Sequence, residues 1–233
     1  LSDANGVVLA RVEGGATALR PGQEHAAADI IKALIGEALA SAERTDTRPA
    51  VCVEGVAGAG QERAAQALWS ALAQRRIADD VSVQADATIA MDDAFGDSAG
   101  VLLIAGTGSV AFSKAPDGRI ERCGGCGPNV GDEGSAAWLG RKALSVVTAA
   151  QDGREPETAL TGAILTALEL EQLDDVIPWA AAATPGTFAQ LAPVILQVAA
   201  SGDLRANALI SFCVEELALH VRTLARRCFV DER

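Results

Sequence analysis

The chain has 233 residues, of which 49% are hydrophobic and 21% are charged, the balance of a globular protein with one large domain or two small ones. Its 31 acidic and 19 basic residues give a net charge of −12, so its surface repels nucleic acids and anionic membranes. No apolar run reaches the roughly 20 residues that span a bilayer, no basic and apolar leader opens the chain, and the five cysteines are irregularly spaced. These features predict a reduced, cytoplasmic protein without nucleic-acid or membrane partners.

The predicted elements alternate between strands and helices along the first half of the chain. A hairpin is expected at residues 1–12, and a helix at 25–42, where Ile31, Leu34 and Ile35 recur at helical spacing. Further strands are predicted at 49–54, 81–84, 101–105, 110–114 and 119–122, and further helices at 61–74 and 87–95. The remainder is predicted to be mostly helical, with breaks near Gly153 and at 184–186 and a last strand starting at Arg226. This order, with glycine-rich loops at strand ends, predicts an α/β fold that binds ligands at the carboxyl edge of its sheet.

The first glycine-rich loop, residues 55–60, follows a buried strand and has the G-x-x-x-x-G spacing of a P-loop. It continues with Gln61 and Glu62 where a P-loop has Lys and Ser or Thr, so it lacks the side chains that bind phosphate and magnesium. Two interpretations stay open: a tight turn whose backbone approaches a ligand, or a purely structural turn.

The second loop contains Gly106, Thr107, Gly108 and Ser109 and fits the start of the dinucleotide fingerprint. That fingerprint requires a helix next, but residues 110–114 are strand-like and lead into a Pro-Asp-Gly turn. The loop is therefore predicted to be the tip of a hairpin. Its hydroxyl groups and free backbone N–H groups make it a cradle for phosphate oxygens, although an ordinary glycine-rich turn has the same appearance.

The third segment, residues 123–140, is the most informative part of the sequence. Five glycines precede or flank Asp132 and Glu133, which are expected to open a helix. Acidic residues at a helix N-terminus offset the macrodipole, which explains the two acids but not the glycines. A carboxylate in a glycine-lined pocket could accept hydrogen bonds from sugar hydroxyls. Cys123 and Cys126 form a C-x-x-C pair, but no second pair completes a zinc site and no helix of the thioredoxin kind follows.

Asp86 stands just after the strand predicted at 81–84, upstream of the second loop. An aspartate at this place is commonly a helix cap. If it shares a cleft with the second loop, it can also accept a proton from a substrate hydroxyl while the loop holds a phosphoryl group.

Together these motifs resemble the N-acetylglucosamine kinase branch of the BadF/BadG/BcrA/BcrD ATPase family, within the actin/hexokinase/Hsp70 superfamily. The matching stretches are residues 55–60, 86–87, 102–109 and 124–140, and the similarity extends over essentially the whole chain. The resemblance implies a two-lobed, actin-like α/β fold with mixed sheets flanked by helices. We expect an incomplete N-terminal lobe at residues 1–105 and a C-terminal lobe at 106–233.

The resemblance also implies a reaction, in which the γ-phosphoryl group of ATP passes to the 6-hydroxyl of glucosamine or N-acetylglucosamine with Mg²⁺ on the phosphates. Asp86 resembles the catalytic base of the family, and Gly106, Thr107, Gly108 and Ser109 resemble its ATP phosphate loop. The residues that resemble sugar contacts are Gly125, Cys126, Gly127, Asp132, Glu133 and Ala136. No protein ligand for a metal is assigned, and a homodimer is expected because relatives are often dimers.

The sequence departs from the family pattern at several places. The family begins with a strand and an Asp-Gly-Gly-Gly-Thr phosphate loop and ends with a Gly-Gly adenosine motif, so we expect this chain to be truncated at both ends. Ala18 stands where relatives carry an asparagine that binds sugar hydroxyls, and Cys126 replaces a bulky aromatic residue. The identity of the sugar therefore stays open.

Two alternatives follow from these departures. One is a non-catalytic sugar-binding or regulatory protein on a degraded kinase fold, against which the retained Asp86 counts. The other is an activator ATPase of a 2-hydroxyacyl-CoA dehydratase, whose cluster-binding cysteine lies just before the second loop, where this chain has Leu103, Ile104 and Ala105.

Overall fold

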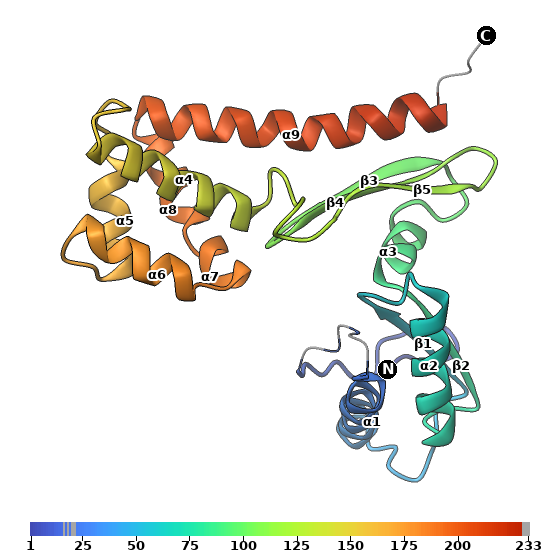
Figure 1. Ribbon diagram of the computed structural model, residues 1–233. Helices are drawn as coiled ribbons and strands as arrows, with labels where there is room; N and C mark the ends of the chain where they lie inside the picture. The colour runs from blue at the N-terminus through green and yellow to red at the C-terminus, as the bar shows by residue number, and fades with distance from the viewer. Residues whose placement is uncertain (16, 18, 20–21, 230–233) are drawn as a thin grey trace. The chain divides into compact units, whose positions relative to one another are not determined.

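The computed structural model describes residues 1–229 apart from 16, 18, 20 and 21 (Figure 1). The chain divides into two compact units, Leu1–Gly96 (unit 1) and Asp97–Arg233 (unit 2). Both units mix helices and strands, which confirms the predicted α/β class. The predicted boundary between an N-terminal lobe at residues 1–105 and a C-terminal lobe at 106–233 concerns the lobes of the family fold, and it stays a prediction.

Unit 1 is built on a two-stranded parallel sheet. Its elements are α1 (Glu24–Ser41), β1 (Val51–Val56), α2 (Glu62–Gln74), β2 (Asp80–Ala85) and α3 (Asp86–Phe95). The register runs from Val51 opposite Asp80 to Val56 opposite Ala85, so β1 and β2 end at the same edge. Side chains of α1 and α2, including Ile31, Leu68 and Leu72, form the core with Val56.

The hairpin predicted at residues 1–12 does not form as a pair of strands. Its place is taken by one isolated antiparallel bridge between Ser2 and Val8, with a turn held by the Asp3 carboxylate, which accepts from the N–H groups of Asn5 and Val7 at 2.9 Å. Val7 and Val8 are exposed. The predicted turn and antiparallel pairing are present in part: the N–H of Asp3 donates to the Val7 carbonyl at 3.0 Å and the N–H of Leu9 to the Leu1 carbonyl at 2.8 Å, although only Ser2 and Val8 form a bridge.

Unit 2 begins with an antiparallel sheet, β3 (Gly100–Ala105), β4 (Ser109–Lys114) and β5 (Ile120–Gly124), in the order β3-β4-β5. The predicted hairpin between β3 and β4 is confirmed, with Ala105 opposite Ser109 at its tip. Along β4, Ser109, Ala111 and Ser113 are buried and alternate with half-buried residues. One face of the central strand therefore carries only small side chains.

The rest of unit 2 is helical, as predicted. Its helices are α4 (Ala136–Gln151), α5 (Leu160–Leu168), the 3-10 turn η1 (Leu173–Asp175), α6 (Val176–Ala182), α7 (Pro185–Ala189), α8 (Ala192–Ala200) and α9 (Leu204–Phe229). Both predicted breaks are confirmed. The chain turns at Gly153 with φ of 74°, and Thr184 caps α7 by accepting from the N–H of Thr187. The strand predicted from Arg226 is wrong, because α9 continues as a helix through Phe229.

Helix α9 ties the two parts of unit 2 together. Figure 1 shows it running along the β3–β5 sheet and on to the helices α4 and α8, and it packs against all of these elements. Near its end Cys228 Sγ lies 2.9 Å from Ser113 Oγ of β4, and nearer its start Cys213 Sγ donates to the Gly134 carbonyl at 2.8 Å. Within the described residues, α9 included, we find no helix both long and apolar enough to cross a bilayer.

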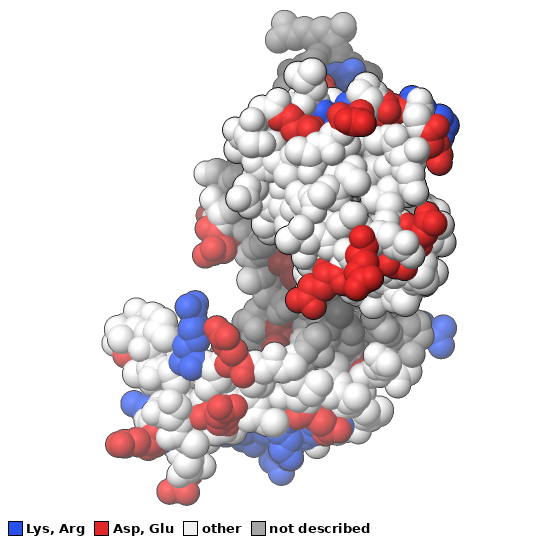
Figure 2. All heavy atoms as spheres, turned by 90° about the vertical axis from the view of Figure 1, so that its left-hand side faces the viewer, with Lys and Arg blue, Asp and Glu red and all other residues white. Residues whose placement is uncertain are grey.

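The surface reflects the acidic composition. Figure 2 shows carboxylate side chains gathered in patches on the face in view, with wide uncharged areas between them. The net charge of −12 predicts a negative potential around such a protein.

Candidate functional site

The second glycine loop and the segment before α4 form one hydrogen-bonded structure. Ser109, which is 3% exposed, donates from its hydroxyl to the carbonyl of Glu133 at 2.7 Å. The N–H of Ala136 donates to the Gly106 carbonyl at 2.9 Å. The structure thus brings the predicted phosphate loop together with the predicted sugar residues at 132–136.

The hairpin tip has the free donors that a phosphate cradle needs. The N–H of Gly106 closes the tip by donating to the Gly108 carbonyl at 2.9 Å. No acceptor among the described residues pairs with the N–H groups of Thr107 and Gly108, and Thr107 is exposed. Backbone donors in such a turn attract anionic oxygens, and the phosphate-binding role of the tip stays a prediction.

Asp132 lies directly against this tip. A Cβ atom on Gly108 would be 2.7 Å from Asp132 Oδ2, so glycine is needed there for the carboxylate to take its place. Asp132 is 9% exposed and has a φ of 59°, in the left-handed region that is unusual for a residue other than glycine. Aspartate is among the non-glycine residues that adopt this conformation most readily, and here the surrounding structure holds it in place.

The expectation that Asp132 and Glu133 open a helix is wrong. Helix α4 starts at Ala136, and its cap is Ser135, whose hydroxyl accepts from the Trp138 N–H at 3.2 Å. The positive φ values of Asp132 and Gly134 cannot belong to a right-handed helix, so the helix has to begin later. The Asp132 carboxylate is consequently not the cap of α4.

The remaining predicted sugar residues lie on the loop that enters this segment. Gly124, Gly125 and Gly127 all have positive φ, between 68° and 90°. The N–H of Gly131 donates to the Gly127 carbonyl at 2.9 Å, and a Cβ atom on Gly131 would be 2.9 Å from the Cβ of Cys126. These contacts fold the loop back on itself, with Cys126 exposed.

Helix α9 contributes a residue to this site that was not predicted from the sequence. His220 of α9 is 7% exposed, and its Nε2 lies 3.9 Å from Glu133 Oε2, while its Nδ1 lies 2.7 Å from the Glu216 carbonyl. The ring also packs so closely on Gly124 that a side chain there would collide with it. A single histidine within a helical pattern gives no signal that could reveal this contact.

Asp86 belongs to unit 1, as the first residue of α3 directly after β2. It is exposed, and its Oδ1 accepts from the N–H of Ala87 at 2.9 Å. Because β1 and β2 are parallel, Asp86 lies at the same sheet edge as Gly55, where an added Cβ would be 3.5 Å from the Asp86 Cα. The local contacts agree with a helix start and leave the carboxylate accessible; its catalytic role stays a prediction.

The glycine loop after β1 has a structural explanation. Gly58 has a φ of 91°, and a Cβ atom there would be 2.8 Å from the Leu19 carbonyl oxygen, while the N–H of Leu19 donates to the Ala57 carbonyl at 2.8 Å. The loop therefore makes room for the chain near residue 19. The departure noted at Ala18 lies outside the described residues.

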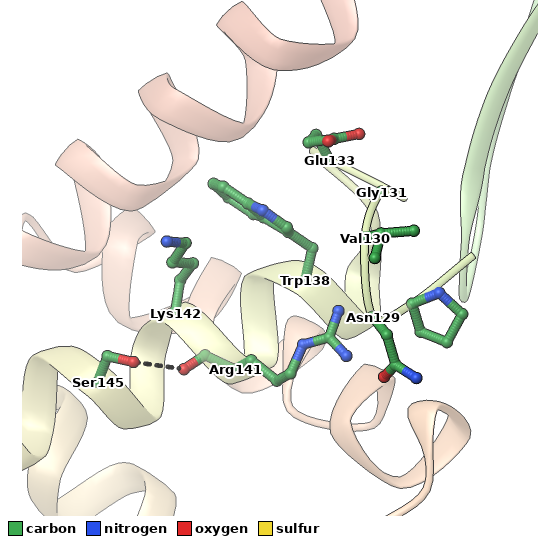
Figure 3. Close-up of a pocket in the computed structure, with 9 residues that line it drawn as sticks. Asn129, Val130, Gly131, Glu133, Trp138, Arg141, Lys142 and Ser145 are labelled. Atoms are coloured by element: carbon green, nitrogen blue, oxygen red, sulfur yellow. Dashed lines mark hydrogen bonds between the residues drawn. The ribbon is translucent and has the colours of Figure 1, made fainter. Parts of the chain in front are cut away.

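A pocket of about 480 Å³ lies beside the third segment (Figure 3). Residues 128–131 and Glu133 line one side of it. Trp138, Arg141, Lys142 and Ser145, all of α4, line the other side. The loop was predicted from the sequence to lie near a ligand, but this face of α4 was not.

The sequence profile of the BadF/BadG/BcrA/BcrD ATPase family matches residues 1–232. The chain belongs to this family, and its fold is the actin-like ATPase fold that the motifs predicted.

Named relatives are sugar kinases. An N-acetylmuramic acid/N-acetylglucosamine kinase of Clostridium acetobutylicum is 28% identical over 220 residues, which are 93% of this chain and 72% of the relative. A glucosamine kinase of Vibrio cholerae is 27% identical over 95% of this chain and 76% of its own length. The crystal structure of a protein from Chromobacterium violaceum, provisionally named an N-acetylglucosamine kinase, superposes with a TM-score of 0.82 at 31% identity, covering 95% of this chain and 76% of that one.

Proposed function

We propose that this protein is an ATP-dependent kinase that transfers the γ-phosphoryl group of ATP to the 6-hydroxyl of an amino sugar. The observation that carries the proposal is the direct bonding of the hairpin tip, residues 106–109, to the segment that holds Asp132. Free N–H donors for phosphate and a carboxylate for sugar hydroxyls are thereby held side by side. The family membership and the kinase names of the relatives support the same conclusion.

In this proposal each group has a separate task. The N–H groups of Thr107 and Gly108 hold phosphate oxygens, and the Asp132 carboxylate accepts hydrogen bonds from sugar hydroxyls. Asp86 accepts the proton of the 6-hydroxyl as that oxygen attacks phosphorus. Because phosphoryl transfer needs little covalent help from the protein, most of the rate enhancement comes from positioning and from neutralising charge.

Mg²⁺ belongs to the proposal as the partner of the ATP phosphates. Among the described residues no three His, Cys, Asp or Glu side chains are grouped closely enough to hold a metal. Mg²⁺ in kinases keeps several waters and is bound through substrate phosphates and one or two carboxylates. The bound ion would supply positive charge on the phosphates.

The dehydratase-activator alternative has less support. The residues just before the hairpin tip, Leu103, Ile104 and Ala105, end strand β3 and offer no thiolate for an iron–sulfur cluster. A cluster bound by Cys ligands needs such thiolates. Iron and sulfide analysis of the purified protein should accordingly find neither element.

The proposal is tested with the native full-length protein and Mg-ATP. ADP release is measured with glucosamine, N-acetylglucosamine, N-acetylmuramic acid and glucose, and the phosphorylated carbon is identified by NMR. We expect ADP release that requires an amino sugar and yields its 6-phosphate. If the folded protein releases no ADP with any of these sugars yet binds one of them, the non-catalytic sugar-binding alternative is correct and the kinase proposal is wrong.

A further inference from the structure

Helix α9 contacts the segment 132–135 along one of its faces. Cys213, Leu217 and His220 are spaced by four and three residues, so their side chains lie on the same side of the helix. The Cys213 thiol donates to the Gly134 carbonyl at 2.8 Å. A Cβ atom on Gly134 would be 2.6 Å from Leu217 Cγ, so glycine is needed there for α9 to approach the backbone.

The bond from Cys213 fixes one peptide unit, the one between Gly134 and Ser135. The carbonyl of this unit accepts from the thiol, and its N–H donates to the Asp132 carbonyl at 3.1 Å. Because a peptide unit is planar, a rotation that breaks one of these bonds also turns the other group away from its partner. Cys213 thereby holds the backbone of Asp132, although the two residues are far apart in the chain.

Asp132 needs such support because of its backbone conformation. Its φ of 59° lies in the left-handed region, which is less favourable than the right-handed one for every residue except glycine. Two elements hold the segment against this cost. From β4 the Ser109 hydroxyl donates to the Glu133 carbonyl at 2.7 Å, and from α9 come the Cys213 thiol and the His220 ring, whose Nε2 lies 3.9 Å from Glu133 Oε2.

The thiol is suited to this bond because it keeps its proton. Cys213 is half-buried, and burial raises the pKa of its thiol. At neutral pH the group is therefore an S–H donor and not a thiolate. The Gly134 carbonyl can only accept, so the bond requires this protonated form.

We propose that Cys213 is a positioning residue, which holds the Asp132 carboxylate in place for the sugar through the Gly134–Ser135 peptide. The inference rests on the kinase function proposed above, in which Asp132 accepts hydrogen bonds from sugar hydroxyls. It gives α9, which carries none of the site residues predicted from the sequence, a share in binding the sugar. Loss of the thiol should weaken sugar binding without changing the chemistry at the phosphate.

The test compares Cys213→Ala, which removes the donor, with Cys213→Ser, which keeps one, in the native full-length protein. KM for the sugar should rise at least about fivefold in Cys213→Ala, the effect of one lost hydrogen bond. The value of kcat should stay within about twofold, because Asp132 binds the sugar equally in the ground and transition states. Cys213→Ser should restore KM to within about twofold of the unaltered protein. Cys228→Ala is the matched control, since it removes another thiol contact of α9, the one at 2.9 Å from Ser113 Oγ, and it should leave KM unchanged.

Two further measurements separate this inference from the kinase proposal. Sugar binding is measured by calorimetry without ATP, so that a Kd raised by Cys213→Ala but not by Cys228→Ala supports the inference even if no sugar is phosphorylated. Amide exchange of Ser135, followed by NMR, should become faster in Cys213→Ala and stay the same in Cys228→Ala. Equal increases of KM in these two variants, or no recovery in Cys213→Ser, would overturn the inference while sugar-dependent ADP release persists. Absence of sugar binding by the unaltered protein would overturn both proposals.

Discussion

Asp86 is the first residue of α3, where its carboxylate is accessible and also bonds the backbone at the start of the helix. One oxygen accepts the N–H of Ala87, and the residue is exposed at the carboxyl edge of the β1–β2 sheet. Local structure needs only one oxygen of the carboxylate for this bond. The substitution that separates the two tasks is therefore Asp86→Asn, which keeps an oxygen acceptor but removes the base.

We expect Asp86→Asn to lower kcat by about 100-fold or more, the contribution typical of a general base, while the dissociation constant of the sugar changes little. The measurements are steady-state ADP release and calorimetric titration with the sugar. Asp93→Asn, at another exposed aspartate of α3, is the control and should be fully active. Full turnover by Asp86→Asn would remove Asp86 from the mechanism.

Gly108 is a second residue of the site at which a substitution tests the proposed function, because a single added Cβ atom would collide with Asp132. Its added Cβ would be 2.7 Å from Asp132 Oδ2, so Gly108→Ala must displace the carboxylate or the tip. We expect a loss of about 1 to 3 kcal/mol in the free energy of unfolding, as for other overpacked sites, and a higher KM for the sugar. Denaturant unfolding and sugar kinetics measure the two effects.

The matched control for this change is Gly162→Ala in α5, where an added Cβ meets nothing within 4 Å. That substitution should leave the protein equally stable or slightly more stable, since alanine favours a helix. A second check uses the Asp132→Ala background, in which Gly108→Ala should cost much less. An equal cost in both backgrounds would show that Asp132 is not the group displaced.

At the scale of elements, the start of α9 depends on one partly buried hydrogen-bond network. The Asp203 carboxylate accepts from the N–H groups of Ala206 and Ala159, both at 2.9 Å, and from the hydroxyl of Thr158 at 3.0 Å. It therefore caps α9 and fastens the chain before α5 to it. Burial alone would raise the pKa of Asp203, but these hydrogen bonds to the charged form lower the pKa overall.

Asp203→Ala should therefore destabilise the protein by about 1 to 2 kcal/mol at neutral pH, the range found for lost helix caps. Because the folded-state pKa is lowered, this stabilisation is present above the unfolded-state value of about 3.9 and is lost as the pH falls through the folded-state value. Urea unfolding at several pH values should show the two proteins converging below roughly pH 4. Asp203→Asn keeps an acceptor and should lie between them; a constant difference at all pH values would contradict the assignment.

At the scale of the whole molecule, the division after Gly96 predicts where the folded chain is cut most easily. Residues 96–99 are exposed and lie between the end of α3 and the start of β3. Exposed segments of this kind are preferred sites of limited proteolysis. A protease specific for acidic residues should thus cleave first at Asp97.

Mass spectrometry of early digests should find fragments that end or begin beside this residue. Asp117 provides an internal comparison, because its turn is exposed but held by hydrogen bonds from Gly118 to the Ala115 carbonyl and from the Arg119 N–H to the Asp117 carboxylate. We expect slower cleavage there. First cuts inside α4 or α9 would show that the division into two units is not the weakest part of the folded chain.

The sequence predicts most elements because their signals are local. Apolar residues at helical spacing located α1, and the glycines at 106 and 108 located the tip of the β3–β4 hairpin. The errors occur where contacts with residues distant in sequence determine whether a segment forms a strand or a helix. Residues 1–10 pair through the Ser2–Val8 bridge and a few further backbone hydrogen bonds without forming strands, and the end of α9 stays helical on the sheet, with Cys228 at Ser113.

At the candidate site, too, the sequence predicted local features but not contacts between distant segments. The glycine motif indicated that residues 124–136 lie near a ligand, and the structure brings them to the tip at 106–109. Glycine spacing alone could not show that Asp132 has a positive φ, which moves the start of α4 to Ala136. Nor could it locate His220 at Glu133, because that contact joins segments that only the packing of α9 brings together.

The packing of α9 on β4 also determines when the β3–β5 sheet can be covered during synthesis. Ser113 and its neighbour Cys228 are 115 residues apart in the chain, so the ribosome makes all of α4 to α8 before that contact can form. Until α9 is made, one face of the β3–β5 sheet is exposed to solvent. Contacts between residues so far apart in sequence slow folding, and the exposed face can aggregate in the meantime. The face of β4 that α9 later covers carries only small side chains, those of Ser109, Ala111 and Ser113. It therefore exposes little apolar surface before α9 packs on it. A bulky apolar side chain at Ala111 or Ser113, both fully buried, would make the uncovered face more prone to aggregation and would also overpack the finished protein.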